Sequence, residues 1–177
     1  MADDPTDEEA IDTLMQNKKK LDTEEKSINV AKNKHAGQSA TYKSPKTGNN
    51  YVASWANDGN TSPYWYHRSV SITGTMNNPF WVVNLGREYE IKKIVVYSRH
   101  RKEWRLKGMR VEIINKDQVV EFKQNGDGAV EKKLLFEFDE DGTTGKYPKG
   151  NNVKISIPNK RVSLDMVEVE VWNRFYE

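Results

Sequence analysis

The sequence predicts an all-β protein, an antiparallel β-sandwich preceded by a short helical arm. Two observations lead to that prediction. From residue 28 onward the apolar residues come in short runs of strand-like composition, and Gly-Asn, Asp-Gly and proline-containing turns separate the runs. No long helical pattern lies between these runs, as it would in a parallel sheet, so we expect the strands to be antiparallel.

The first predicted element is an acidic helical arm over residues 1–27. Thr6–Glu9 fits a helix capping box with acids in the first turn, and Ile11, Leu14 and Met15 then recur at helical spacing. The arm carries nine acids and four bases, so its net charge is −5. A helix of this length is marginally stable alone in water, so we expect it to dock on the β domain or on a protein partner, or to remain a mobile arm.

The second predicted unit is a β domain over residues 28–177. Val167–Val171 alternates strictly between apolar and acidic residues, as a half-buried strand does, and Ile91–Tyr97 is more uniformly apolar, which is typical of a central strand. The predicted strands are Tyr51–Trp55, Phe80–Leu85, Ile91–Ser98, Met109–Asn115, Val119–Lys123, Lys132–Phe138, Val153–Ile157 and Val162–Trp172.

The composition narrows the functional classes. The chain has no cysteine, which excludes disulfides and thiolate metal sites, and its N-terminus has no apolar core of the kind a signal peptide needs. No apolar stretch approaches the ~20 residues of a membrane span. There is no Gly-rich phosphate loop, HExxH or GxSxG, and the three histidines lack zinc-site spacing. These observations favour a protein that is not an enzyme. The sequence leaves the compartment undetermined and favours a protein that is intracellular or part of a large assembly.

The β domain carries an excess of positive charge. It has 17 acids and 24 bases, a net charge of +7, and much of the excess falls between Arg87 and Arg110. Such a patch could face phosphate, sulfate or an acidic partner, or could be a solvated loop between two strands. Nucleic acid is an unlikely partner, because the strands lack the interleaved aromatic residues that single-strand binders use.

Several motifs, taken in order, resemble a known family. They are Ala53–Asn60 (ASWANDGN), Asn78–Gly86 (NPFWVVNLG), Tyr89–Arg99 and Leu164–Val171 (LDMVEVEV). This series resembles the fucolectin (F-type lectin) branch of the discoidin family, which includes the C domains of coagulation factors V and VIII. The resemblance covers roughly residues 28–172. It implies a galactose-binding-like jelly-roll fold for the β domain.

The resemblance also implies a calcium site. Hard oxygen ligands from carboxylates and carbonyls are what Ca²⁺ takes in proteins, and its role here would be to rigidify loops. The alternative is that Asp58-Gly59 is only a hairpin turn and Glu168 only an outward strand residue. The implied ligands are the carboxylates of Asp58 and Glu168, the carbonyls of Trp55, Asn60 and Val167, and Ser69.

A sugar site is the third implication. Fucolectins hold fucose with a histidine and two arginines and shelter its methyl group with aromatic side chains. Arg99 and Arg105 match the arginines, but Ile72 stands where the histidine is expected. The adjacent cysteines of fucolectins are replaced around Lys102–Trp104, where an indole could supply a stacking face instead. The implied ligand-binding residues are Trp65, Tyr66, His67, Arg99, Trp104 and Arg105.

Two functions from different classes remain open on the sequence. The first is a non-catalytic carbohydrate-binding module with a calcium-stabilised loop, whose partner is a glycan or glycoprotein. The second is a structural or assembly protein, such as a subunit of a virion or another large complex, that uses the sandwich as a protein-binding scaffold. In the second case the N-terminal helix would contact the protein partner.

Overall fold

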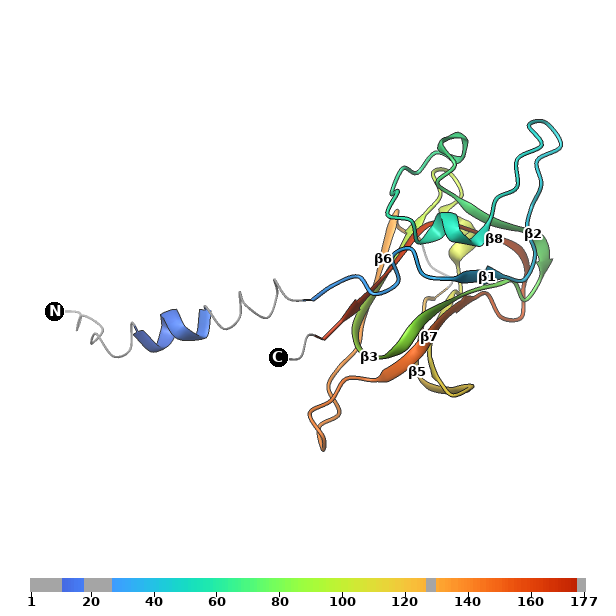
Figure 1. Ribbon diagram of the computed structural model, residues 1–177. Helices are drawn as coiled ribbons and strands as arrows, with labels where there is room; N and C mark the ends of the chain where they lie inside the picture. The colour runs from blue at the N-terminus through green and yellow to red at the C-terminus, as the bar shows by residue number, and fades with distance from the viewer. Residues whose placement is uncertain (1–10, 18–26, 127–129, 175–177) are drawn as a thin grey trace.

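The structure is a computed structural model that describes residues 11–17, 27–126 and 130–174. It confirms the predicted antiparallel β-sandwich, and a short N-terminal helix over residues 11–17 is present (Figure 1). The elements are β1 (Ala36–Gln38), η1 (Ala53–Ala56), η2 (Trp65–His67), β2 (Ser71–Asn77), β3 (Phe80–Ser98), η3 (Glu103–Leu106), β4 (Arg110–Asn115), β5 (Gln118–Gln124), β6 (Lys133–Glu137), β7 (Lys149–Ser156) and β8 (Arg161–Asn173), where η marks a short 3₁₀ helix.

Strand β3 belongs to both layers of the sandwich. Its first part, from Phe80 to Asn84, pairs with β7 and lies next to β1, and its second part, from Ile91 to Ser98, pairs with β8 and β6. The register with β7 shifts between the two parts, where Gly86 has φ +88°, a conformation that glycine adopts at little cost. The sequence predicted two strands here, and the structure joins them into one.

The core lies between the layers and contains the inward-facing side chains of most strands. Trp81, Leu85, Ile94, Ile155 and Val169 are fully buried. Burying a side chain of this size contributes about 1.5–3 kcal/mol. The Trp81 indole N–H donates to the Ala53 carbonyl at 2.9 Å, so the largest core residue leaves its one polar atom paired. This bond also ties η1, the start of the Asp-Gly loop, to the rigid centre of the fold.

Two sequence predictions were wrong. The predicted strand Tyr51–Trp55 is largely the 3₁₀ turn η1, because the Trp55 N–H bonds back to the Val52 carbonyl instead of joining a ladder. The sequence also missed β2, whose pairing with β8 breaks between Ile72 and Thr75 around Gly74 at φ +76°. Strand propensity identified the aromatic run, but local hydrogen bonds determined its conformation.

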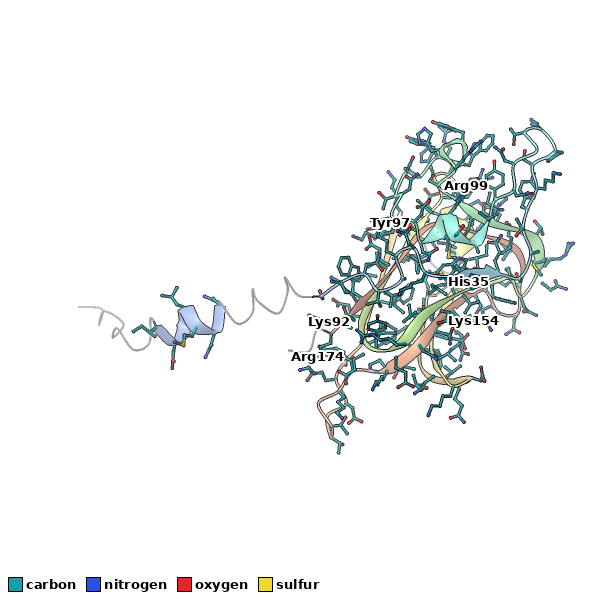
Figure 2. The ribbon with its side chains drawn as sticks, viewed as in Figure 1. His35, Lys92, Tyr97, Arg99, Lys154 and Arg174 are labelled. Carbon is teal, nitrogen blue, oxygen red and sulfur yellow. The ribbon has the colours of Figure 1, made fainter. Side chains whose placement is uncertain are left out.

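The first described residues of the β domain lie beside the end of its last strand. Asn29 bridges to Trp172, and the Ile28 N–H donates to the Asn173 side-chain carbonyl at 2.9 Å. Arg99 lies at the other end of the sandwich, away from Arg174 (Figure 2). The chain therefore enters the β domain beside the C-terminal end of β8, and the loops around Arg99 lie at the opposite end of the sandwich (Figure 2).

The predicted arm is described only in part. Residues 11–17 are helical and all exposed, while the capping-box residues and residues 18–26 lie outside the described residues. Ile11, Leu14 and Met15 are more than half exposed. Among the helices that the structure describes, none is long and apolar enough to cross a membrane.

Candidate functional site

Two arginines converge on one buried carboxylate at the end of the sandwich. Arg99 directly follows β3, and η3 turns the chain so that Arg105 approaches from the same side. Their Nη1 atoms lie 2.8 Å and 2.6 Å from Oδ2 of Asp165, which is fully buried in β8. The other carboxylate oxygen accepts from the Ser163 hydroxyl at 2.5 Å. Asp165 thus orients both guanidinium groups from the buried side of the site.

Each of these guanidinium groups keeps an unused donor. The Nε atoms of Arg99 and Arg105 are buried and have no hydrogen-bond partner among the described residues. These Nε atoms have almost no accessible surface, so a ligand would meet the remaining exposed part of each side chain, which is 18% exposed in Arg99 and 21% exposed in Arg105. Two cations on one carboxylate also leave a net charge of +1 at this point. The pair therefore presents oriented donors to a polar ligand.

The arginines line a cavity of about 370 Å³. Tyr51 lies at the centre of its aromatic wall, with ring centroids 5.8 Å from Tyr42 and 6.4 Å from Trp65. Aromatic faces beside charged planar donors suit the mixed apolar and hydroxyl surface of a sugar. The lining residues are Tyr42, Ser44, Pro45, Lys46, Tyr51, Trp65, Ile72, Gly74, Thr75, Arg99, Lys102, Arg105 and Ser163.

Ile72 lies in the wall of this cavity. It is 4% exposed, and in the β2–β8 ladder it pairs with Asp165, the residue that holds the two arginines. The side chain belongs to a small apolar cluster with Tyr51, Val70 and Val167 under the loops. The position where the resemblance implies a histidine thus offers methyl groups to the cavity and no hydrogen bond.

The structure brings three of the six implied ligand residues to the cavity: Trp65, Arg99 and Arg105. Tyr66 is 61% exposed, and His67 Nδ1 lies 2.5 Å from the Ser62 hydroxyl; neither lines the cavity. Trp104 borders a neighbouring groove instead.

Sequence reasoning missed three important residues of the cavity. Tyr42 and Tyr51 lie between β1 and η1 and belong to neither of the implied ligand sets, so only their aromatic character could have pointed to a role in the site. Asp165 lies within the quoted motif LDMVEVEV, and its acid breaks the apolar start of that strand. An acid among the apolar residues at the start of a predicted strand was the signal available there.

The Asp-Gly loop is held to the sandwich by Asn57. This side chain is fully buried, and its amide donates to the carbonyls of Ala31 at 2.8 Å and Lys34 at 2.9 Å. The turn that follows is tight: Gly59 has φ +89°, and Asp58 Oδ1 accepts from the backbone N–H of Asn60 at 2.8 Å. The loop is therefore a turn, and it is anchored at a defined place.

This turn meets Glu168 of β8. The Gly59 N–H donates to Glu168 Oε1 at 3.1 Å, while Oε2 is buried and has no partner among the described residues. Burial is the main cause that raises the pKa of the fully buried Glu168 carboxyl to about 8. The charges of Asp58 and Glu170 also raise this pKa, whereas the Gly59 hydrogen bond and Lys32 lower it.

The remaining implied calcium ligands lie around the same turn. Val167 precedes Glu168 and is fully buried, and Trp55 packs against the same apolar cluster. The Ser69 hydroxyl donates to the Ser62 carbonyl at 2.6 Å, so as a ligand it would offer only its lone pairs.

The oxygen donors around Asp58 and Glu168 determine which metal this region could hold. No group of three or more His, Cys, Asp or Glu side chains suited to a metal occurs in the part of the chain that the structure describes. A metal here would depend on two carboxylates together with carbonyl oxygens. The unpartnered Oε2 of Glu168, with the Asp58 carboxylate near it, fits a hard, oxygen-seeking cation such as Ca²⁺.

Solved structures similar to this chain include lectin modules. The lectin domain of lectinolysin, complexed with Lewis B antigen, is 28% identical, with 82% of this chain and 96% of that chain covered and a TM-score of 0.69. The fucose-binding module SpX-3 of Streptococcus pneumoniae is 26% identical, with 85% and 99% covered and a TM-score of 0.69. A fucolectin from striped bass (Morone saxatilis) serum is 23% identical, with 85% of this chain and 48% of that chain covered and a TM-score of 0.66, a likeness of fold.

The family comparison agrees with these structures and with the resemblance inferred from the motifs. No curated protein matches the sequence. The model of the NedA-like, galactose-binding domain family, one of the F5/F8 type C families, matches residues 55–150, which is more than half of the chain. The matched segment runs from the Asp-Gly loop through both arginines to the start of β7. The chain therefore belongs to the NedA-like, galactose-binding domain family of F5/F8 type C domains.

Proposed function

We propose that this protein is a non-catalytic carbohydrate-binding module whose sugar site is the cavity around Arg99 and Arg105. The observation that carries the proposal is the arginine pair itself. Asp165 holds both guanidinium groups by their Nη1 atoms, and the two side chains remain 18% and 21% exposed where they line the cavity. A sugar that offers neighbouring hydroxyl and ring oxygens would accept hydrogen bonds from the exposed part of these groups and rest its apolar face on Tyr42 and Trp65.

The named ligands of the similar structures support a fucosylated glycan as the first candidate. One of these structures is complexed with Lewis B antigen, and another is called a fucose-binding module. The cavity described here keeps both arginines and an aromatic wall, but Ile72 contributes methyl groups where the resemblance implies a histidine. We therefore expect weaker binding of free fucose than of a larger glycan that also uses the surrounding loops.

Calcium forms the second part of the proposal. Asp58 and Glu168 would supply carboxylates, and Trp55, Asn60 and Val167 would supply carbonyls, with Ser69 adding a hydroxyl oxygen. The ion would neutralise a buried carboxylate and fix the loop that carries the aromatic side chains. The chain's own residues would do the recognition. The arginines donate hydrogen bonds, Asp165 orients them, and Tyr42 and Trp65 exclude water from one sugar face.

A glycan array probed with and without a calcium chelator tests the proposal. We expect binding to a set of fucosylated or galactosylated oligosaccharides that weakens when the chelator is present. Arg99→Ala and Arg105→Ala should abolish it. Arg101→Ala, which removes an exposed arginine of the same loop, is the matched control and should bind as the native chain does.

The alanine variants also remove a cation from a buried carboxylate, so a second variant separates binding from folding. Arg99→Lys keeps a positive charge beside Asp165 but loses the planar fork of donors. It should melt close to the native chain and still lose glycan binding. A native chain that binds no glycan on the array refutes the carbohydrate-binding proposal.

One observation favours a second function, a protein-binding scaffold. Ile11, Leu14 and Met15 expose apolar side chains on the helix over residues 11–17. A partner protein that covers them would explain their exposure. Deletion of residues 1–27 tests this: the scaffold proposal requires loss of partner binding while the β domain stays folded.

A further inference from the structure

A second groove lies beside the sugar cavity and shares Arg105 with it. Its volume is about 360 Å³, close to that of the first cavity. One wall comes from η3 and the residue after it, and the other comes from the start of β8. Its lining residues are Trp104, Arg105, Lys107, Lys160, Arg161 and Val162. A ligand bound to Arg105 in the first cavity is therefore already at the edge of the second.

The groove is positively charged. Four of its six described lining residues are cations, and none is an acid. Lys107 and Arg161 form no ion pair of 4 Å or less within the described ranges, and Lys160 Nζ lies 3.4 Å from the Lys107 carbonyl. Two acids lie close by in the sequence or the fold: Glu103, which accepts from the Arg101 N–H, and the buried Asp165.

The neighbouring cavity adds to this charge. Lys46, Arg99 and Lys102 line it, again without an acid among the lining residues described. Asp165 offsets part of the charge of Arg99 and Arg105, but it lies behind them and is fully buried. Like charges gathered along one cleft repel one another and attract an anion that enters it.

Trp104 gives the groove an apolar face. It is 53% exposed, and the cationic groups of Arg105 and Lys102 lie 5.4 Å and 5.9 Å from its ring centroid. An exposed indole is a platform for the apolar face of a sugar ring. The groove thus combines a stacking surface with cations, which a purely solvated basic loop would not need.

We propose that this groove is a second subsite that binds an anionic sugar residue, one carrying a sulfate ester or a carboxylate, of the glycan whose neutral residue occupies the first cavity. The inference rests on the proposed function, because it requires a sugar at the arginine pair. Arg105 contacts both residues of the glycan, Trp104 stacks on the second, and Lys107 and Arg161 pair with its anionic group.

The test compares three glycans on the full chain by calorimetry or interferometry. The first is a neutral fucosylated tetrasaccharide of the Lewis b type, the second is the same compound with one sulfate ester, and the third carries a sialic acid. We expect one of the anionic glycans to bind at least about fivefold more tightly than the neutral one, the effect of one or two partly exposed ion pairs. Which one it is distinguishes the sulfate from the carboxylate.

The double variant Lys107→Gln, Arg161→Gln should remove this preference while neutral-glycan binding changes by less than about twofold. The control is the double variant Lys92→Gln, Lys116→Gln. Both of its lysines are exposed and line neither cavity, and Lys92 lies seven residues before Arg99 on β3, roughly 23 Å away at about 3.3 Å per residue (Figure 2). The control should keep the preference. Raising the salt from about 0.1 M to about 1 M, which shortens the Debye length from about 10 Å to about 3 Å, should reduce it.

The outcomes separate this inference from the proposed function. Equal binding of the neutral and anionic glycans refutes the second subsite and leaves the first intact. A preference that survives in the groove variant refutes it too. If neither glycan type binds, the proposed function fails together with the inference. If a single-stranded oligonucleotide binds as tightly as the anionic glycan and is lost in the same variant, the groove binds polyanions generally and the inference is wrong.

Discussion

Replacing Glu168 by glutamine tests the buried carboxyl directly. In the native chain without calcium, burial raises the pKa of this carboxyl to about 8 from the ordinary value of 4.5. Between these values the folded chain holds a proton that the unfolded chain has released, so the free energy of unfolding falls as the pH rises. The stabilisation that this proton adds to the folded chain is complete below about pH 4.5 and is lost above about pH 8. Glu168→Gln cannot titrate and should lack this component of the pH dependence.

The size of the effect follows from the same two pKa values. Each tenfold change in acidity corresponds to about 1.4 kcal/mol, so the interval from 4.5 to about 8 amounts to at most roughly 5 kcal/mol. This is a large part of the stability of a typical domain. In chelator, Glu168→Gln should therefore be more stable than the native chain at pH 8, and the two should converge toward pH 5.

Calcium should narrow this difference. The ion binds the ionised carboxylate, and at a concentration 100 times its dissociation constant it would add about 2.7 kcal/mol to the native chain. The variant has lost one carboxylate ligand and should gain much less. Urea unfolding followed by tryptophan fluorescence, at several pH values with chelator or with calcium, measures all four combinations.

Two results would refute this reasoning. If the free energy of unfolding depends on pH in the same way for the native chain and the glutamine variant in chelator, the Glu168 carboxyl does not have a raised pKa in the folded chain. Equal stabilisation of both by calcium, or of neither, would remove Glu168 from the proposed metal site. The first result concerns burial and the second concerns the ion, so either claim can fail alone.

Three further changes have defined outcomes. Asn57→Ala removes two buried hydrogen bonds to backbone carbonyls and should lower the free energy of unfolding by about 2–4 kcal/mol in urea; an unchanged midpoint contradicts the anchoring role. Gly59→Ala forces φ +89° on a residue whose Cβ would lie 2.8 Å from Lys32 Cε. We expect the free energy of unfolding to fall by roughly 1–2 kcal/mol, and a calcium titration to show weaker binding. Values equal to those of the native chain would argue against backbone strain at this position. Ile72→His should raise the affinity for a fucosylated glycan about fivefold, the effect of one added hydrogen bond; no gain would show that this position does not face the sugar.

Much of the fold was predictable because its signals are local. The alternation of Val167–Val171 and the apolar run Ile91–Tyr97 both correspond to real strands, β8 and the second part of β3. The single strand β3 was not predictable, because Gly86 and the polar residues after it read as a turn. In the structure the strand continues through a register shift against β7 between Asn84 and Tyr89, and it pairs with β8 from Ile91 onward, which depends on contacts far apart in the sequence.

The candidate site was predictable only where it carries a motif. Arg99 and Glu168 were singled out through family patterns, whereas Tyr42 and Tyr51 reach the cavity from the segment between β1 and η1, where the resemblance implies no ligand residue. The cationic groove depends on Lys107 and Arg161, which lie more than fifty residues apart and meet through the packing of η3 against the start of β8. Charge counting indicated a basic region, but only the fold shows which cations share a surface.

The pairing of Asn29 with Trp172 determines which end of the domain lies next to a molecule joined to its termini. Asp165, behind the arginine pair, precedes Asn173 by eight residues on β8, which is roughly 26 Å at about 3.3 Å per residue. Whatever is joined to the domain at either terminus is therefore tethered at the end remote from the loops around Arg99. Several copies on one carrier could point their loops outward together and engage a dense glycan layer, where a high effective concentration converts weak single contacts into strong adhesion.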